Sequence, residues 1–141
     1  MIDNHIVYQG VDMPGAKIAR SDHRITETPN ALMATLASPT HGGTSTLSLW
    51  RVTMRAAQRG PRHAFDVEQA WHLLVGAATI TVEAETFALR VGDTVVIPAG
   101  CRRQVSTDSG AEFVVTGPAD GRAVTISAEG AGEPIAPAWI V

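Results

Sequence analysis

Residues 92–100 read GDTVVIPAG, and this stretch specifies more of the architecture than any other part of the sequence. The pair Gly92-Asp93 predicts a turn, and the β-branched residues 94–97 predict a short strand. Pro98 ends that strand because proline cannot donate a hydrogen bond to the ladder. The run Pro98-Ala-Gly100 predicts a second turn. One segment therefore fixes a turn, a strand length and a strand end together.

Short segments of the same kind lie on both sides of this stretch. Residues 46–54 (TLSLWRVTM) are rich in β-branched and aromatic side chains and contain neither Gly nor Pro. Residues 78–83 and 86–89 predict a hairpin across Ala84-Glu85. Repeated short strands with turns between them predict an all-β sandwich or closed barrel. Further strands are expected at residues 6–9, 31–36, 69–75, 104–106, 112–116 and 123–127.

Length and composition restrict the class of protein. The chain has 141 residues, the size of one domain, and its 45% apolar and 18% charged residues are typical of a globular protein. A net charge of −3 argues against nucleic acid as the main partner. No apolar run is long enough to span a membrane, and the first residues lack the features of a signal peptide. With Cys101 as its single cysteine, the sequence indicates a soluble cytoplasmic protein.

The strand pattern divides the chain into three parts. Residues 1–45 are expected to form an N-terminal arm with short strands, and residues 46–127 to form the barrel. Residues 128–141 form a tail with an apolar end, which we expect to dock on the barrel or on a partner subunit. The arm and the tail are also the segments that favour a homodimer.

Residues 46–116 resemble a cupin, the double-stranded β-helix or jelly-roll barrel. Cupins carry two motifs: H-x-H, three or four residues, E, six residues, G; and G, five residues, P-x-G, two residues, H, three residues, N. Residues 92–100 match the opening of the second motif at every fixed position, and Gly76 supplies the glycine that ends the first. The resemblance implies a jelly-roll barrel that binds a small molecule.

The register of these motifs shows which residues stand where cupins place metal ligands. His63 takes the first histidine position, Phe65 the second and Gln69 the glutamate position, while Arg103 takes the histidine position of the second motif. A divalent metal needs several neutral imidazoles and a carboxylate. Phe65 cannot ligate, Gln69 carries no charge, and Arg103 adds a fixed positive charge. We therefore expect a degenerate metal site and no cofactor.

A register shifted by one residue leaves a metal alternative open. Glu68 then becomes the carboxylate, and His63 and Glu68 are two candidate ligands, although the spacing to Gly76 no longer fits the motif. This alternative predicts a metal-dependent enzyme.

The altered positions predict an aromatic small-molecule pocket. Strand alternation puts Gln69 and Trp71 on one face of their strand, which the resemblance turns into the barrel. An apolar lining with a few polar groups is typical of a ligand site. The alternative for both tryptophans is a purely structural place in the core. The expected ligand-binding residues are Phe65, Gln69, Trp71 and Trp50.

His63 and Arg103 are the expected catalytic residues. His63 is the side chain that can move a proton near neutral pH, and Arg103 suits a carboxylate, enolate or phenolate. The first hypothesis is therefore a metal-independent isomerase, cyclase or lyase acting on an oxygenated, partly apolar metabolite. The second is a non-catalytic ligand-binding or sensory cupin. A solvated loop position for His63 and a surface ion pair for Arg103 remain the alternatives without function.

Overall fold

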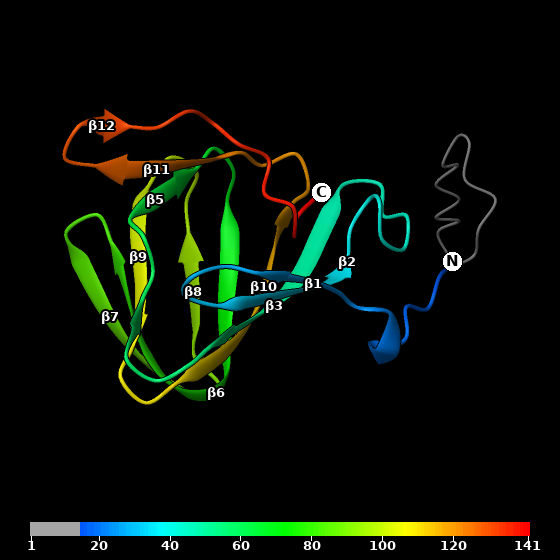
Figure 1. Cartoon of the computed structure of the whole chain (residues 1–141), viewed down its shortest axis with the longest axis horizontal. Helices are drawn as coiled ribbons and strands as arrows, with labels where there is room; N and C mark the ends of the chain where they lie inside the picture. The colour runs from blue at the N-terminus through cyan, green and yellow to red at the C-terminus, as the bar shows by residue number, and fades with distance from the viewer. Residues whose placement is uncertain (1–14) are drawn as a thin grey trace, which may run out of the picture.

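The computed structural model describes residues 15–141, so the strand expected at residues 6–9 lies outside the described part of the chain. In that part the secondary structure is twelve strands and one turn of 3-10 helix, η1 (Arg20–Asp22). The expected all-β barrel is confirmed (Figure 1). The strands are β1 (Arg24–Glu27), β2 (Leu32–Ala37), β3 (Leu47–Met54), β4 (Gln58–Arg59), β5 (His63–Phe65), β6 (Gln69–Val82), β7 (Glu85–Arg90), β8 (Thr94–Ile97), β9 (Arg102–Thr107), β10 (Ala111–Pro118), β11 (Ala123–Ser127) and β12 (Gly130–Ala131).

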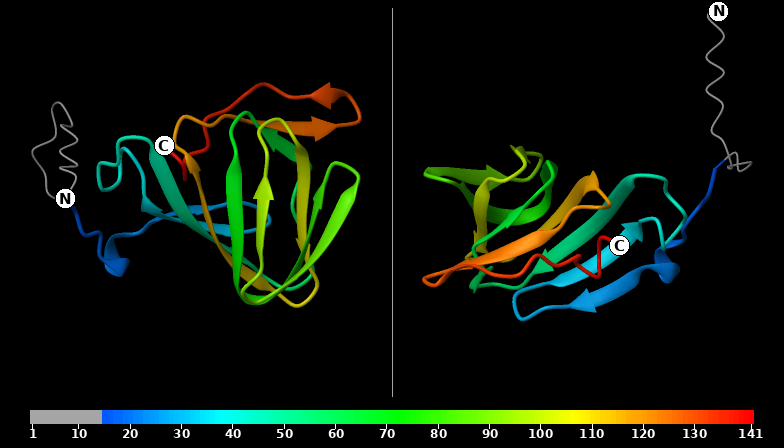
Figure 2. Two further views of the ribbon diagram at one scale, coloured as in Figure 1. Left: turned by 180° about the vertical axis from the view of Figure 1, so that it is seen from behind. Right: turned by 90° about the horizontal axis from the view of Figure 1, so that it is seen from above.

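The strands form two antiparallel sheets that share β6. The first sheet has the order β1-β2-β3-β10-β6, with β8 also paired to β6. The second continues from β6 through β9, β5 and β11 to β12, with β7 paired to β6 and β4 to β9. The two sheets face each other and enclose the interior of the barrel (Figures 1 and 2). This arrangement is a jelly-roll fold.

β6 passes from one sheet to the other at Gly76. Its first half pairs with β10 and β8, and its second half pairs with β7 and β9. Gly76 has φ +82°, and a Cβ atom there would lie 2.1 Å from the carbonyl oxygen of Gly110. Glycine is required because both the left-handed backbone and the close approach exclude a side chain. The two strands expected at residues 69–75 and 78–83 are therefore one continuous, bent strand.

The segment at residues 92–100 positions β8 and β5. β8 has the bounds that the sequence predicts, and the Asp93 carboxylate accepts a hydrogen bond from the Arg90 amide at 3.0 Å. After β8, the Gly100 amide donates to the Phe65 carbonyl at 2.7 Å. The turn that follows Pro98 thus fixes the end of β5, the strand that carries His63 and Phe65.

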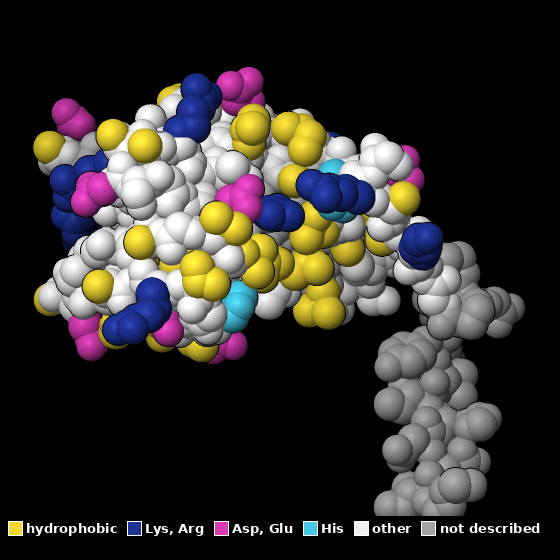
Figure 3. All heavy atoms as spheres, turned by 90° about the horizontal axis from the view of Figure 1, so that it is seen from below, with side chains coloured by type: hydrophobic (Ala, Val, Ile, Leu, Met, Phe, Trp, Pro, Cys, Tyr) yellow, Lys and Arg dark blue, Asp and Glu magenta, His cyan; other side chains and the backbone are white. Residues whose placement is uncertain are grey.

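β1 and β2 extend the first sheet at β3. β2 pairs with β3 over most of its length, and β1 is left as an edge strand. The strand expected at residues 31–36 corresponds to β2. Hydrophobic side chains gather on one face of the molecule (Figure 3), and Ile25, Leu32 and Leu47 of the first sheet are exposed.

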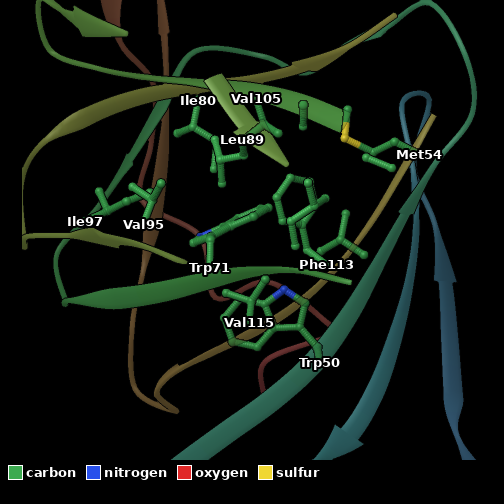
Figure 4. Close-up of a cluster of buried hydrophobic side chains, with 14 of the residues drawn as sticks. Trp50, Met54, Trp71, Ile80, Leu89, Val95, Ile97, Val105, Phe113 and Val115 are labelled. Carbon is green, nitrogen blue, oxygen red and sulfur yellow. The ribbon is translucent and has the colours of Figure 1, made fainter. Parts of the chain in front are cut away.

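The core lies between the two sheets, where alternate residues of each strand point inward (Figure 4). The rings of Trp71 and Phe113 meet edge to face, with centroids 5.2 Å apart. Burying each large side chain stabilises the fold by roughly 1.5–3 kcal/mol. Among the described residues, the hydrophobic side chains with no exposed surface are Leu73, Ile80, Ile97, Phe113 and Val115.

The tail docks on its own chain. Ile140 is buried in the core, and the Ser48 hydroxyl donates a hydrogen bond to its carbonyl. The Thr35 hydroxyl donates to the Trp139 carbonyl at 2.8 Å. These contacts hold the tail against β2 and β3 and place Trp139 beside the core.

Candidate functional site

A cavity of about 430 Å³ is lined by β2, β3, β5, β6 and β11, by the turn between β1 and β2, and by the tail after β12. This volume lies within the range that small-molecule sites occupy. Four residues predicted from the sequence line it: Trp50, His63, Phe65 and Trp71. Two others, Gln69 and Arg103, are buried at 1% exposure and are not part of the lining in the described chain.

His63 lines the cavity, and a hydrogen bond to the backbone fixes its tautomer. Its Nδ1 lies 2.9 Å from the Pro61 carbonyl oxygen, and since a carbonyl only accepts, Nδ1 carries the proton. Nε2 is then the nitrogen with a free lone pair. Burial lowers the pKa of His63 below its ordinary value of 6.5; the bond to Pro61 opposes this shift, and the charge of Arg103 adds to it. His63 is therefore a neutral imidazole at pH 7, suited to accept a proton.

The His63 ring also lies against Phe65, the residue two positions along β5. The two rings meet edge to face, with centroids 5.5 Å apart. His63 is half-buried and belongs to a strand, so the solvated loop position does not describe it.

Arg103 is buried behind Phe65. β9 pairs with β5 so that Arg103 lies opposite His63, and the guanidinium carbon lies 5.4 Å from the centre of the Phe65 ring. Nε and Nη2 donate to the Cys101 carbonyl at 3.2 and 2.9 Å, and Nη1 donates to the Gln69 side-chain oxygen at 3.2 Å. Burial lowers the pKa of Arg103 to about 10, while Cys101 opposes the shift. Arg103 is still a cation at pH 7, and its bonds are made inside the protein, where a surface ion pair does not form.

Gln69 connects Arg103 to Trp71. Its Oε1 accepts hydrogen bonds from Arg103 Nη1 and from Trp71 Nε1, both at 3.2 Å. This double acceptor fixes the orientation of the amide, whose Nε2 is buried without a partner in the described part of the chain. We call the three side chains the Arg103–Gln69–Trp71 network. It holds the Trp71 indole, and with it one wall of the cavity, in place.

The residues at the metal-ligand positions do not fit a divalent metal. His63 is the only imidazole among the four positions, none of them is a carboxylate, and the Gln69 oxygen already accepts from Arg103 and Trp71. The Arg103 guanidinium brings a positive charge where a cation would need an imidazole. Within residues 15–141, no three His, Cys, Asp or Glu side chains come together in a group that could hold a metal ion. Glu68 is exposed and does not line the cavity, so the structure does not assemble the His63–Glu68 alternative.

The sequence prediction missed the contributions of the tail and of the first hairpin. Trp139, Ile135 and Glu133 line the cavity from the tail, and Met33 and Asn30 line it from β2 and the turn before it. The apolar end of the tail was a signal for docking, but only the fold shows that it docks over the cavity. Trp50 and Trp71 belong to both the core and the lining.

Comparison with known proteins agrees with this fold. Residues 50–117 match the family model of the cupin domain. An RmlC-like cupin from Shewanella frigidimarina superposes with a TM-score of 0.64 at 16% identity, covering 72% of this chain and 88% of that one. KdgF from Halomonas sp. gives 0.64 at 19% identity, covering 74% and 93%. The polyketide cyclase RemF from Streptomyces resistomycificus gives 0.62 at 20%, covering 72% and 78%.

No protein with a curated description matches this chain. At the identities of the solved structures, the likeness shows the fold and leaves the chemistry to the residues of the site. The described chain also contains no helix long and apolar enough to cross a membrane.

Proposed function

Because this chain belongs to the cupin superfamily, we propose that it is a small-molecule cupin that transfers a proton on an oxygenated, partly apolar metabolite without a metal. Isomerisation, cyclisation and elimination are the reactions that need this step and no redox centre. The observation that carries the proposal is His63: a neutral imidazole, fixed by Pro61 and lining an apolar cavity.

In this proposal His63 acts as the general base. Nε2 accepts a proton from a carbon next to a carbonyl group, the electron pair of the broken C–H bond forms a carbon–carbon double bond, and the π pair of the carbonyl moves to its oxygen to give an enolate. The imidazolium then returns the proton to another position of the ligand. The hydrogen bond from Nδ1 to Pro61 holds the ring in the tautomer that this step requires.

Arg103 stabilises the developing negative charge through space. The direct contact with a ligand anion that the sequence suggests is replaced by hydrogen bonds from all three guanidinium nitrogens to Gln69 and Cys101. The positive charge lies behind Phe65, the ring that separates it from the cavity. In an environment poor in water such a fixed charge favours an enolate over the neutral ligand.

Exchange of the acidic α-protons of β-tetralone, a neutral aromatic ketone, tests this function. Proton NMR in D2O follows the loss of the α-proton signal with and without protein. We expect the protein to accelerate exchange, and His63→Gln to slow it by about 10²–10⁴-fold. His72→Gln is the matched control, because His72 bonds to Thr94 and does not line the cavity.

The same experiment separates the enzyme from the second candidate, a non-catalytic binding or sensory cupin. That candidate is favoured by the largely apolar wall with its three tryptophans and Phe65, which offers binding surface but few groups able to transfer a proton. Binding of β-tetralone without faster exchange would contradict the catalytic proposal and support the binding protein. Exchange that persists in His63→Gln would contradict the role of His63.

We also propose a homodimer in the cytoplasm. The tail is used by its own chain, so the exposed apolar residues of the first sheet are what support the dimer: Ile25, Leu32 and Leu47. The single cysteine agrees with a reducing compartment. Light scattering should give twice the chain mass of 14.9 kDa. Leu47→Glu should shift it to the monomer and Val91→Glu, equally exposed at 58%, should not; a monomeric parent protein would contradict the proposal.

A further inference from the structure

The aromatic residues of this chain are concentrated in one place. Only 5% of the residues are aromatic, yet all three tryptophans, Trp50, Trp71 and Trp139, line the same cavity, together with Phe65. They come from two strands of the first sheet, from β5 and from the tail, so neighbours in sequence do not account for the grouping. Indole and phenyl rings gain most from contact with another flat ring.

The charges around the cavity disfavour an anionic ligand. Among the described residues that line it there is no lysine or arginine, and Glu133, on the exposed rim, is the one acidic residue. Arg103, which lies opposite His63, is buried against Phe65 and hydrogen-bonded to Gln69 and Cys101. A ligand carboxylate would have to leave water as a full charge and would gain no direct ion pair. An enolate formed from a ligand that is already bound neutral does not have this cost, so the through-space charge of Arg103 favours the enolate without favouring an anionic ligand.

The neutral polar groups of the lining suit hydroxyl or keto oxygens. Thr125, His63 and Asn30 are among the lining residues and carry a hydroxyl, a neutral imidazole and an amide, the last with its Nδ2 bonded to Gln58. These groups hold oxygen substituents of a ligand without requiring a charge on it.

We propose that the ligand is a flat, uncharged, fused-ring aromatic compound that carries hydroxyl or keto oxygens. This inference rests on the proposed function, since it assigns the substrate class of the same cavity. The Arg103–Gln69–Trp71 network supports it, because it fixes the Trp71 indole before a ligand arrives. A wall ordered in advance costs less conformational entropy on binding. The positions that hold a metal in the cupin pattern thus support an aromatic wall in this chain.

Three small probes distinguish this ligand class from its alternatives. Isothermal titration calorimetry of the full chain would compare β-naphthol, a neutral phenol at pH 7, with its saturated analogue decalol and its anionic analogue β-naphthoate. We expect β-naphthol to bind at least about tenfold more tightly than decalol, because decalol cannot form ring contacts. We also expect it to bind at least about tenfold more tightly than β-naphthoate, because of the desolvated carboxylate. Equal or tighter binding of either analogue would overturn the inference.

The NMR signals of the indole groups show whether β-naphthol binds beside the three tryptophans. The three tryptophans give three indole N–H signals, and β-naphthol should shift all of them. Binding that leaves the indole signals unmoved would overturn the inference even if the affinities followed the expected order.

Substitutions at Trp139 test the aromatic contact without emptying the core, because this side chain is half-buried in the tail. Trp139→Leu should weaken β-naphthol binding by about tenfold, and Trp139→Phe should retain most of it. Phe87→Leu is the control, since Phe87 is half-buried on β7 and does not line the cavity. Equal binding by the leucine and phenylalanine variants of Trp139 would contradict the inference.

The two proposals fail in different ways. Preferential binding of β-naphthol without exchange of β-tetralone leaves the ligand class standing and contradicts the catalytic function. Exchange of β-tetralone through His63, with decalol bound as tightly as β-naphthol, leaves the function standing and contradicts the ligand class.

Discussion

Two parts of the cupin pattern have diverged to different extents in this chain. Residues 92–100 keep every fixed position in the opening of the second motif, and they form the turn, the strand β8 and the hydrogen bond from Gly100 to the end of β5. The ligand positions at residues 63, 65, 69 and 103 keep one histidine and lose the rest. The first part acts through the backbone, and the second acts through side chains that meet in the interior. The backbone structure of the barrel can therefore be retained while the side chains that perform the chemistry are replaced.

The largest expected effect comes from the backbone of the barrel, at Gly76, the glycine that ends the first cupin motif. Gly76→Ala should lower the free energy of unfolding by about 4 kcal/mol, because the new Cβ has no space beside the Gly110 carbonyl and the backbone has φ +82°. Gly92→Ala is the matched control: Gly92 has φ +97° but no atom within 4 Å of its Cβ position. It should lose about 1–2 kcal/mol. Urea denaturation measures both, and equal losses would contradict the role assigned to the close approach.

The next effect comes from the ligand positions. Gln69→Leu removes the acceptor shared by Arg103 and Trp71 and leaves a buried cation with one bond fewer, so the free energy of unfolding should fall by about 2–3 kcal/mol. Arg103→Met removes the charge together with its desolvation cost, and stability should change by less than about 1 kcal/mol.

The double variant Gln69→Leu/Arg103→Met sharpens this test. It should recover part of the loss caused by Gln69→Leu, because no unpaired cation remains. A larger loss for Arg103→Met than for Gln69→Leu would show that Arg103 itself stabilises the fold, and would contradict the expectation that its charge and its desolvation cost offset each other.

The pH dependence of His63 gives a smaller effect. Because only the neutral imidazole accepts a proton, exchange of β-tetralone should stay constant at neutral pH and fall as the pH drops through the lowered pKa of His63, below 6.5. Arg103→Met should move this fall to higher pH, because the Arg103 charge contributes to the lowering. A pH profile of exchange that is the same in Arg103→Met as in the parent protein would contradict the electrostatic coupling between Arg103 and His63.

The same pKa shift affects stability. The unfolded chain binds the His63 proton at higher pH than the folded chain does, so this group lowers the free energy of unfolding as the pH falls below about 6.5. Urea denaturation at a series of pH values should show a weaker dependence in His63→Gln than in the parent protein. An identical dependence in both would contradict the lowered pKa.

The sequence predicted the backbone better than the side-chain contacts. Turn residues and alternating strands located β3, β7, β8, β10 and β11, because local patterns determine them. The short strand β5 was missed, because it follows a Gly-Pro loop and exists only through its pairing with β9 and β11. β1, β4 and β12 were missed for the same reason.

At the site, the motif register brought His63 and Phe65 to the cavity, and Trp50 was placed there on its aromatic character. The motif register did not show that the Arg103 side chain bonds to Cys101 and Gln69, since a long side chain can reach several partners from one backbone position. Trp139 was out of reach as well, because its place depends on how the tail docks on β2 and β3.

The metal content of the purified protein tests the replacement of the metal site most directly. Elemental analysis of protein prepared without chelator should find well under one transition-metal ion per chain, because Arg103 and Phe65 leave His63 without partner ligands. The variant Phe65→His/Gln69→Glu/Arg103→His restores the full ligand pattern and should bind nickel or zinc when titrated. One iron, nickel or zinc ion bound per chain of the parent protein would contradict the account.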